Sequence, residues 1–179
     1  LFVIWTLYLR LPTWISHYQL ESRNFYSLLG ESQKNLAQNG KSPDTEISLL
    51  SLSAEQSSLF KSERQTGRRR IVVFWATWCG PCKVELERFN RLVSEGVLKY
   101  GDLIAISSEE DLNLVKAVVQ TRGYNFEVLL DTTGEVARRL QVAMTPTVFF
   151  IDESGRIDWV SAGVSPTLEW RVRHFFRLK

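Results

Sequence analysis

The chain has 179 residues and a net charge of +2, and 44% of its residues are hydrophobic. This length leaves room for one domain plus an appendage, the apolar content can fill a core, and the charge argues neither for nor against a nucleic-acid partner. Both cysteines, Cys79 and Cys82, lie in one short motif. Their position excludes a framework of structural disulfides, and it permits an oxidising compartment without demonstrating one.

Residues 1–20 are predicted to be an apolar N-terminal segment. Arg10 interrupts the apolar run, which is shorter than the roughly 20 apolar residues of a membrane-spanning helix. Four aromatic side chains suit a membrane–water interface: Trp5, Tyr8, Trp14 and Tyr18. The chain starts without methionine, which favours interpreting the segment as a truncated signal anchor. An interfacial helix and a helix docked on the domain are the alternatives. No small-residue cleavage site follows, which favours a retained anchor over a removed secretory peptide.

The polar residues 21–43 are predicted to be a linker, and residues 44–179 are predicted to form the domain. At the start of the domain, the alternation of Ile47 and Leu49 with polar residues predicts a strand. Residues 55–67 are compatible with a short helix and loop. The basic run at residues 68–70 directly precedes an apolar stretch, so we interpret it as a solvated turn rather than a binding patch.

The motif Cys79-Gly80-Pro81-Cys82 lies between a predicted strand and a predicted helix. Residues 71–76 are apolar and β-branched, as expected of a buried strand in a parallel sheet. One helical face is then formed by Cys82, Leu86, Phe89 and Val93. The first sulfur is therefore expected at a helix N-terminus, where unpaired N–H groups and the helix dipole favour a thiolate. Since the second cysteine lies one turn further on, it can attack a mixed disulfide formed by the first. We interpret the motif as a redox site.

The cysteine pair has two other interpretations. A structural zinc site needs four ligands, and the chain offers only His17 and His174 besides the cysteines, near opposite ends. A chance pair of core cysteines would leave the preceding strand and the intervening Gly-Pro as coincidences. Neither is favoured, and we predict no metal.

The rest of the chain predicts alternating strands and helices, as in a sheet covered on both faces. Ser108 with Asp111 is typical of a helix start, and Pro166 is expected at the first position of the last helix. The predicted strands are residues 103–106, 126–130, 148–151 and 156–160, and the predicted helices are residues 112–123, 135–140 and a last one from Ser165.

Two segments of the chain, Phe74–Lys83 and Met144–Ile157, resemble the active-site segment and the cis-proline loop of the thioredoxin superfamily. Thr77 favours its TlpA/ResA-like branch, and the resemblance covers roughly residues 71–176. It implies an α/β, thioredoxin-like fold with a central mixed β-sheet, helices on both faces and an N-terminal extension, which in this branch includes a hairpin.

The second motif, Thr145-Pro146, has two interpretations from its residues alone. An X-Pro bond that enters a strand is a place where a cis peptide occurs, but a proline can also simply open a strand, and the residues alone favour neither interpretation. The resemblance favours the cis form. Thr145 would then present its backbone beside the cysteines, where an extended substrate could pair with it by strand addition.

The resemblance also implies the roles of individual residues. Cys79 attacks a substrate disulfide and Cys82 resolves the product, while Trp78, Gly80, Pro81, Thr145 and Pro146 contact the substrate. Thioredoxins carry an acidic residue under the site where this chain has Val73. As proton acceptor we therefore consider Glu110, which matches a glutamate of ResA-like proteins and has Glu109 beside it, and then Glu85; an ordinary solvated carboxylate is the alternative for all three. Glu87 replaces a family proline, which predicts a straighter helix.

We therefore expect a protein-disulfide oxidoreductase with no cofactor besides its own dithiol. The Gly-Pro pair resembles reducing thioredoxins, with potentials of about −270 mV, rather than oxidants at about −120 mV. The expected clients are disulfide-containing proteins on the periplasmic side of a bacterial inner membrane, as in cytochrome c maturation, with a membrane thiol electron donor and no nucleic acid. The alternatives are a peroxiredoxin-like thiol peroxidase and a non-catalytic binding or assembly module.

Overall fold

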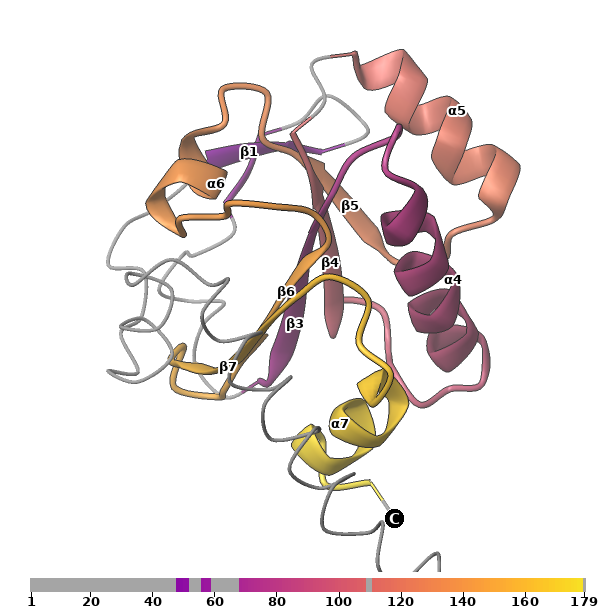
Figure 1. Ribbon diagram of the computed structural model, residues 1–179, viewed down its shortest axis with the longest axis vertical. Coiled ribbons are helices and arrows are strands. Elements are labelled where there is room, and N and C mark those ends of the chain that lie inside the picture. The colour runs from indigo at the N-terminus through magenta and orange to yellow at the C-terminus, as the bar shows by residue number, and fades with distance from the viewer. Residues whose placement is uncertain (1–47, 52–55, 59–67, 109–110, 179) are drawn as a thin grey trace, which may run out of the picture.

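The computed structural model describes residues 48–51, 56–58, 68–108 and 111–178, which form a mixed β-sheet with helices on both faces (Figure 1). The strands are β1 (Ser48–Ser51), β2 (Gln56–Ser58), β3 (Arg70–Trp75), β4 (Leu103–Ser107), β5 (Glu127–Leu130), β6 (Thr147–Ile151) and β7 (Ile157–Ala162). The helices are α4 (Gly80–Ser94), α5 (Leu112–Arg122), α6 (Glu135–Arg139) and α7 (Leu168–Phe175). The predicted α/β class and the predicted order of elements from residue 70 onward are confirmed.

The strand order β2-β1-β5-β4-β3-β6-β7 places β3 near the middle of the sheet. β3 is parallel to β4, and β4 is parallel to β5. β6 is antiparallel to both β3 and β7, and β1 is antiparallel to both β5 and β2. α4 and α5 connect the parallel strands and step in the same direction across the sheet. Because such crossovers are almost always right-handed, both helices lie on the same face (Figure 1).

Successive residues of β3 supply the two cores of the protein. Val73 and Trp75 belong to a core that also contains buried residues of α4, α5 and α7. Val72 and Phe74 belong to a second core, with Val136 of α6. Side chains alternate between the faces of a strand, so a strand covered by helices on both faces is apolar throughout. This explains the uninterrupted apolar run at residues 71–76.

α4 buries the face predicted from its spacing. Cys82, Leu86 and Phe89 are fully buried, and Val93 packs against the same core while remaining partly exposed. The helix continues without interruption through Glu87, which is exposed and forms an ion pair with Arg122 of α5. The glutamate at the family proline position therefore links two neighbouring helices.

The predicted capping of α5 by Ser108 and the predicted start of the last helix are wrong, whereas the predicted start of α5 at Leu112 is confirmed. Ser108 does not cap α5; the carboxylate of Asp111 accepts hydrogen bonds from the N–H groups of Asn113 (2.8 Å) and Leu114 (3.3 Å). Asp111 caps the helix because it directly precedes the first helical residue, and from there its side-chain oxygen reaches these unpaired N–H groups. The last helix, α7, begins at Leu168 rather than at Pro166. The turn before it is held instead by contacts with α4, described below.

The predicted strand near residues 47–52 is confirmed as β1, which pairs with β5 and with β2. The short-helix alternative for residues 55–67 is wrong at Gln56–Ser58, because these residues complete an antiparallel hairpin with β1. The predicted apolar segment and linker, residues 1–20 and 21–43, lie outside the described residues. Within the described ranges, no helix combines the length and the apolar character needed to cross a membrane.

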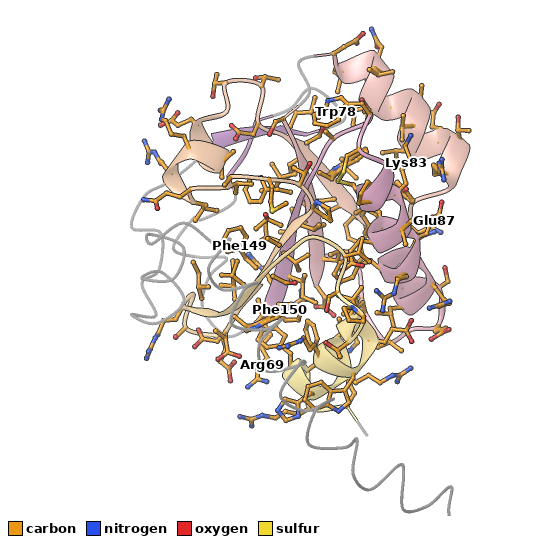
Figure 2. All side chains as sticks on the ribbon, viewed as in Figure 1. Arg69, Trp78, Lys83, Glu87, Phe149 and Phe150 are labelled. Atoms are coloured by element: carbon orange, nitrogen blue, oxygen red, sulfur yellow. A yellow bond between two sulfur atoms is a disulfide. The ribbon has the colours of Figure 1, made fainter. Side chains whose placement is uncertain are left out.

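The basic run at residues 68–70 is not a solvated turn, contrary to the prediction. Arg68 forms a 2.9 Å ion pair with Asp102. Arg69 donates hydrogen bonds to Glu153 (2.7 Å) and to the carbonyl of Phe175, and its guanidinium lies 5.3 Å from the centre of the Phe175 ring. The run lies where β3 starts, beside the β6–β7 hairpin and the end of α7, so its cations have partners there. Figure 2 shows Arg69 and Trp78 at opposite ends of the sheet.

Candidate active site

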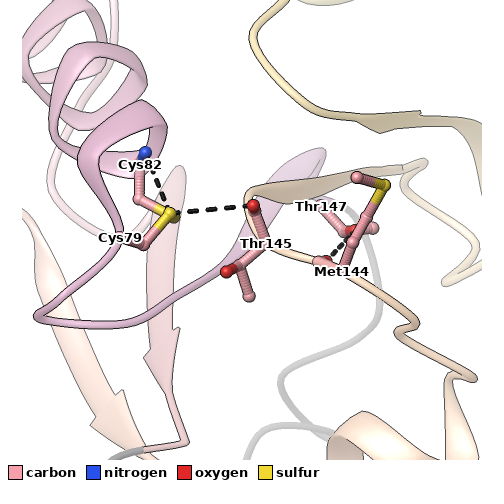
Figure 3. Close-up of a disulfide and its surroundings, with 5 residues drawn as sticks. All are labelled: Cys79, Cys82, Met144, Thr145 and Thr147. Carbon is pink, nitrogen blue, oxygen red and sulfur yellow. Dashed lines mark hydrogen bonds between the residues drawn. A yellow bond between two sulfur atoms is a disulfide. The ribbon is translucent and has the colours of Figure 1, made fainter.

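Cys79 is the N-cap residue of α4. Its Sγ accepts a hydrogen bond from the N–H of Cys82 at 3.1 Å, one of the donors that the first turn of a helix leaves unpaired (Figure 3). The strand β3 ends at Trp75, and the short connection brings the chain back over the carboxyl edge of the sheet. The predicted position of the first sulfur at a helix N-terminus is therefore confirmed, and the local field there favours a negatively charged sulfur.

The two cysteines are joined by a disulfide, with their Cα atoms 5.3 Å apart. Cys79 is 4% exposed and Cys82 is 0% exposed, so Cys79 is the more exposed of the two residues. The intervening Gly80 and Pro81 are exposed, and Trp78 before them is 76% exposed. A large apolar surface thus lies directly beside a recessed disulfide.

The second sequence motif lies against the disulfide. The Thr145–Pro146 peptide bond is cis, as the resemblance implied. The carbonyl oxygen of Thr145 lies 3.6 Å from Sγ of Cys79 (Figure 3). In the disulfide this sulfur carries no proton, so the contact is not a hydrogen bond. After reduction, the thiol of Cys79 could donate a hydrogen bond to this carbonyl. Segments 66 residues apart are therefore brought together at the reactive sulfur.

The loop that contains Val164 lies beside the cis-proline. The N–H of Gly163 donates a 2.7 Å hydrogen bond to the carbonyl of Pro146. Val164 is 41% exposed and Met144, on the other side of the proline, is 46% exposed. Sequence patterns did not single out these two apolar side chains, because their exposure depends on loops that meet only in the folded chain.

Glu85 is a fully buried carboxylate one turn after Cys82. Its Oε1 accepts a 3.2 Å hydrogen bond from the N–H of Ser165, and its Oε2 lies 3.1 Å from Nη1 of Arg88. Burial is the strongest influence on this group and raises the pKa of Glu85 above its ordinary value of 4.5, while the Ser165 hydrogen bond and the Arg88 charge act in the opposite direction. Glu85 is therefore not an ordinary solvated carboxylate.

The other candidates for a proton acceptor give a different picture. Glu110 and its neighbour Glu109 lie outside the described residues. Val73 is 0% exposed in the core, so β3 supplies an apolar side chain where thioredoxins have an acid. Arg88 and Ser165 were not singled out from the sequence. The three-residue spacing from Glu85 to Arg88 could have indicated an ion pair on one helix face, but Ser165 is 80 residues from Glu85 and only the fold brings it there.

No group of three or more potential metal-ligating side chains occurs in the part of the chain that the structure covers. Both sulfurs of the motif are engaged with each other. The chemistry available at this site is thiol–disulfide exchange: an external dithiol can reduce the Cys79–Cys82 disulfide, and the resulting dithiol can reduce an external disulfide.

Together, the fold and the disulfide at the N-terminus of α4 define a thioredoxin-like thiol–disulfide oxidoreductase. The family model described as the AhpC/TSA family matches residues 40–160. The chain belongs to this family and, within the thioredoxin superfamily, to the TlpA/ResA-like proteins. The earlier expectation of a thioredoxin-like enzyme is thus confirmed.

Individual relatives agree with this assignment. The thioredoxin-like protein YneN of Bacillus subtilis is 30% identical over 146 residues, which cover 78% of this chain and 80% of that protein. The thiol-disulfide oxidoreductase ResA of Oceanobacillus iheyensis is 30% identical over 121 residues, which cover 68% of this chain and 62% of that protein.

Solved structures share the fold. StoA from Bacillus subtilis has a TM-score of 0.60 and 22% identity, over 74% of this chain and 96% of that one. A thiol-disulfide oxidoreductase from Bacteroides fragilis has a TM-score of 0.63 and 22% identity, over 75% of this chain and 98% of that one.

Proposed function

We propose that this protein reduces disulfides in client proteins outside the cytoplasm, of the kind that must be opened during cytochrome c maturation. The observation that carries the proposal is the placement of Sγ of Cys79, which caps α4 and lies 3.6 Å from the carbonyl of Thr145. A sulfur in this place can be held as a nucleophile while a client segment lies along the cis-proline loop.

The reaction begins from the dithiol form. The Cys79 thiolate attacks one sulfur of the client disulfide, forms a mixed disulfide and releases the other client sulfur as a thiolate. Cys82 then gives its proton to an acceptor and attacks Sγ of Cys79, which re-forms the Cys79–Cys82 disulfide and releases the second client thiolate. The client gains two electrons and the protein loses two, so an external dithiol must reduce the protein before the next cycle.

A client is expected to bind at the edge formed by Thr145. Within the described residues, the N–H of Thr145 has no hydrogen-bond partner, so it can pair with an extended backbone. Three exposed apolar side chains are available to contact the client: Met144 directly precedes Thr145, Val164 follows Gly163, which bonds to Pro146, and Trp78 precedes Cys79. Gly80 and Pro81, which follow Cys79, are exposed as well.

The direction of electron flow rests on Gly80-Pro81, the pair found in reducing thioredoxins. The apolar residues 1–20 support a membrane attachment, with the domain on the periplasmic side of a bacterial inner membrane and a membrane thiol protein as electron donor. No cofactor other than the dithiol enters this scheme.

The redox potential of the Cys79/Cys82 pair tests the direction. Equilibration of the full chain with thiol buffers, followed by alkylation and mass measurement, is expected to give a value near −270 mV, about that of thioredoxin. A value near −120 mV, about that of the strong oxidants of this fold, would assign the protein to disulfide formation instead.

Glu85→Gln is expected to slow the resolving step, because glutamine cannot accept the proton of Cys82. Since burial raises the pKa of Glu85, the wild-type rate should fall as the pH decreases through that raised value, and the glutamine variant should lose this dependence. The rate at neutral pH should decrease about a hundredfold or more. Stopped-flow measurement of mixed-disulfide decay provides the test, and an unchanged rate and pH profile would remove Glu85 as acceptor.

A further inference from the structure

Arg88 of the active-site helix makes four contacts, and two of them join this helix to the turn before α7. Its Nη1 lies 3.1 Å from Glu85 and also donates to the carbonyl of Ser165, while Nη2 lies 3.5 Å from the carbonyl of Pro166. Its Nε lies 3.9 Å from Glu169 of α7. A planar guanidinium has several donors in a fixed arrangement, and here they serve one buried carboxylate and two backbone carbonyls.

The same carboxylate is also held from the opposite direction. The N–H of Ser165 donates to Oε1 of Glu85, so Ser165 receives a hydrogen bond from Arg88 through its carbonyl and gives one to Glu85 through its N–H. The turn reaches the active site through Gly163, whose N–H donates to the carbonyl of Pro146. A continuous set of contacts therefore runs from Glu85 to the cis-proline loop that touches Cys79.

We infer that Arg88 is a positioning residue for disulfide exchange, which holds the buried Glu85 carboxylate in place and in its charged form, the form that can accept the proton of Cys82. This inference rests on the proposed function, in which Glu85 is the acceptor. Arg88 touches neither cysteine and acts through Glu85.

Electrostatics supports this role. A carboxylate with no exposed surface loses its hydration, which favours the neutral form, and a neutral acid cannot accept a proton. Arg88 is the charged side chain that opposes this effect on the pKa of Glu85. Glu169 of α7 lies near both Arg88 and Arg91. On α4 itself, Cys82 lies one turn before Glu85. Among the contacts of the described residues, removal of the Arg88 charge would leave the Ser165 hydrogen bond to stabilise the charged form of Glu85.

The experiment uses the reduced full chain and dithiobis(nitrobenzoate), an aromatic disulfide whose thiolate is coloured. Attack by Cys79 releases one thiolate, and attack by Cys82 on the mixed disulfide releases a second, so the two steps appear as successive phases. In Arg88→Gln the second phase is expected to be about tenfold slower at about pH 6, because removing a nearby opposite charge raises the pKa of an acid by about one unit or more. At high pH it should recover, and the first phase should be unchanged.

Arg91→Gln is the matched control, since Arg91 lies on the same helix and pairs with Glu169 but makes no contact with Glu85 among the described residues. It is expected to keep the wild-type pH profile. If Arg88→Gln also keeps that profile while Glu85→Gln is slow, the inference about Arg88 is wrong and the proposed function remains. If Glu85→Gln resolves at the wild-type rate, the acceptor assignment itself is wrong.

A second variant covers the case in which Arg88→Gln does not fold. Arg88→Lys keeps the charge but loses the planar arrangement of donors. In carbon-13 NMR spectra of the oxidised protein, the carboxyl carbon of Glu85 is expected to titrate at a higher pH in this variant than in the wild type. Identical titration curves would contradict the positioning role of Arg88.

Discussion

Cys82→Ser is expected to trap the protein as a mixed disulfide with its client, whereas Cys79→Ser should form no such adduct. The reason is the division of roles at the N-terminus of α4, where Cys79 is the more exposed residue and receives the N–H hydrogen bond, and Cys82 is fully buried. Without the first sulfur, the rate of disulfide reduction should decrease by at least about a thousandfold, as when other catalytic nucleophiles are removed.

Reduction of insulin disulfides measures the loss in Cys79→Ser, and non-reducing electrophoresis with mass spectrometry detects the adduct of Cys82→Ser. Treatment with a small thiol should release the trapped client, which separates a mixed disulfide from a non-covalent complex. If Cys79→Ser retained insulin reduction, the proposed chemistry would be wrong.

The same two variants distinguish the alternative functions. Consumption of peroxide that is lost in Cys79→Ser and kept in Cys82→Ser would favour a thiol peroxidase, which needs one reactive cysteine. A binding or assembly module would keep its function when both cysteines are replaced by serine. If the protein is an oxidoreductase, both substitutions should impair disulfide reduction: Cys79→Ser before the mixed disulfide forms, and Cys82→Ser after it forms.

Phe89→Ala is expected to lower the free energy of unfolding by about 3–5 kcal/mol. The Phe89 side chain is 0% exposed in the core between α4 and the sheet, and alanine would leave a cavity there that the surrounding structure only partly fills. Since α4 also carries the cysteines and Glu85, loosening this contact would disturb the site as well as the fold.

Urea unfolding of the oxidised protein, monitored by tryptophan fluorescence, measures this change. Val84→Ala on the same helix is the control, because Val84 is 51% exposed and its truncation should change the stability by about 0.5 kcal/mol or less. A loss below about 1 kcal/mol for Phe89→Ala would show that α4 contributes less to the core than its burial indicates.

The elements with strong periodicity could be predicted from the sequence. The apolar run of β3 and the spacing of Leu86 and Phe89 in α4 both follow the pattern of burial within a single strand or helix, so the local sequence is enough to identify these buried residues. The errors occurred at element ends. At the start of α5, both Ser108 and Asp111 have side chains that can cap a helix, and local spacing does not say which of them does so; at the start of α7, no side chain caps the first turn.

The candidate site divides in a similar way. Cys79 and Cys82 are three residues apart in the chain, and their chemistry was apparent because this spacing by itself puts both at one helix start. Arg69 was misread because its partners, Glu153 and Phe175, are distant in the sequence. The contact between Glu85 and Ser165 was not foreseen for the same reason.

The sequence by itself determined the dithiol chemistry, the buried strand before it and the family of the fold, because these depend on residue types at short spacing. Only the tertiary structure decided what surrounds the sulfurs. The burial of Glu85, its contact with Arg88 and Ser165, and the approach of Thr145 to Cys79 all require segments from different parts of the chain to meet. Burial and electric field at a point are set by everything packed around it, and that is a property of the folded chain.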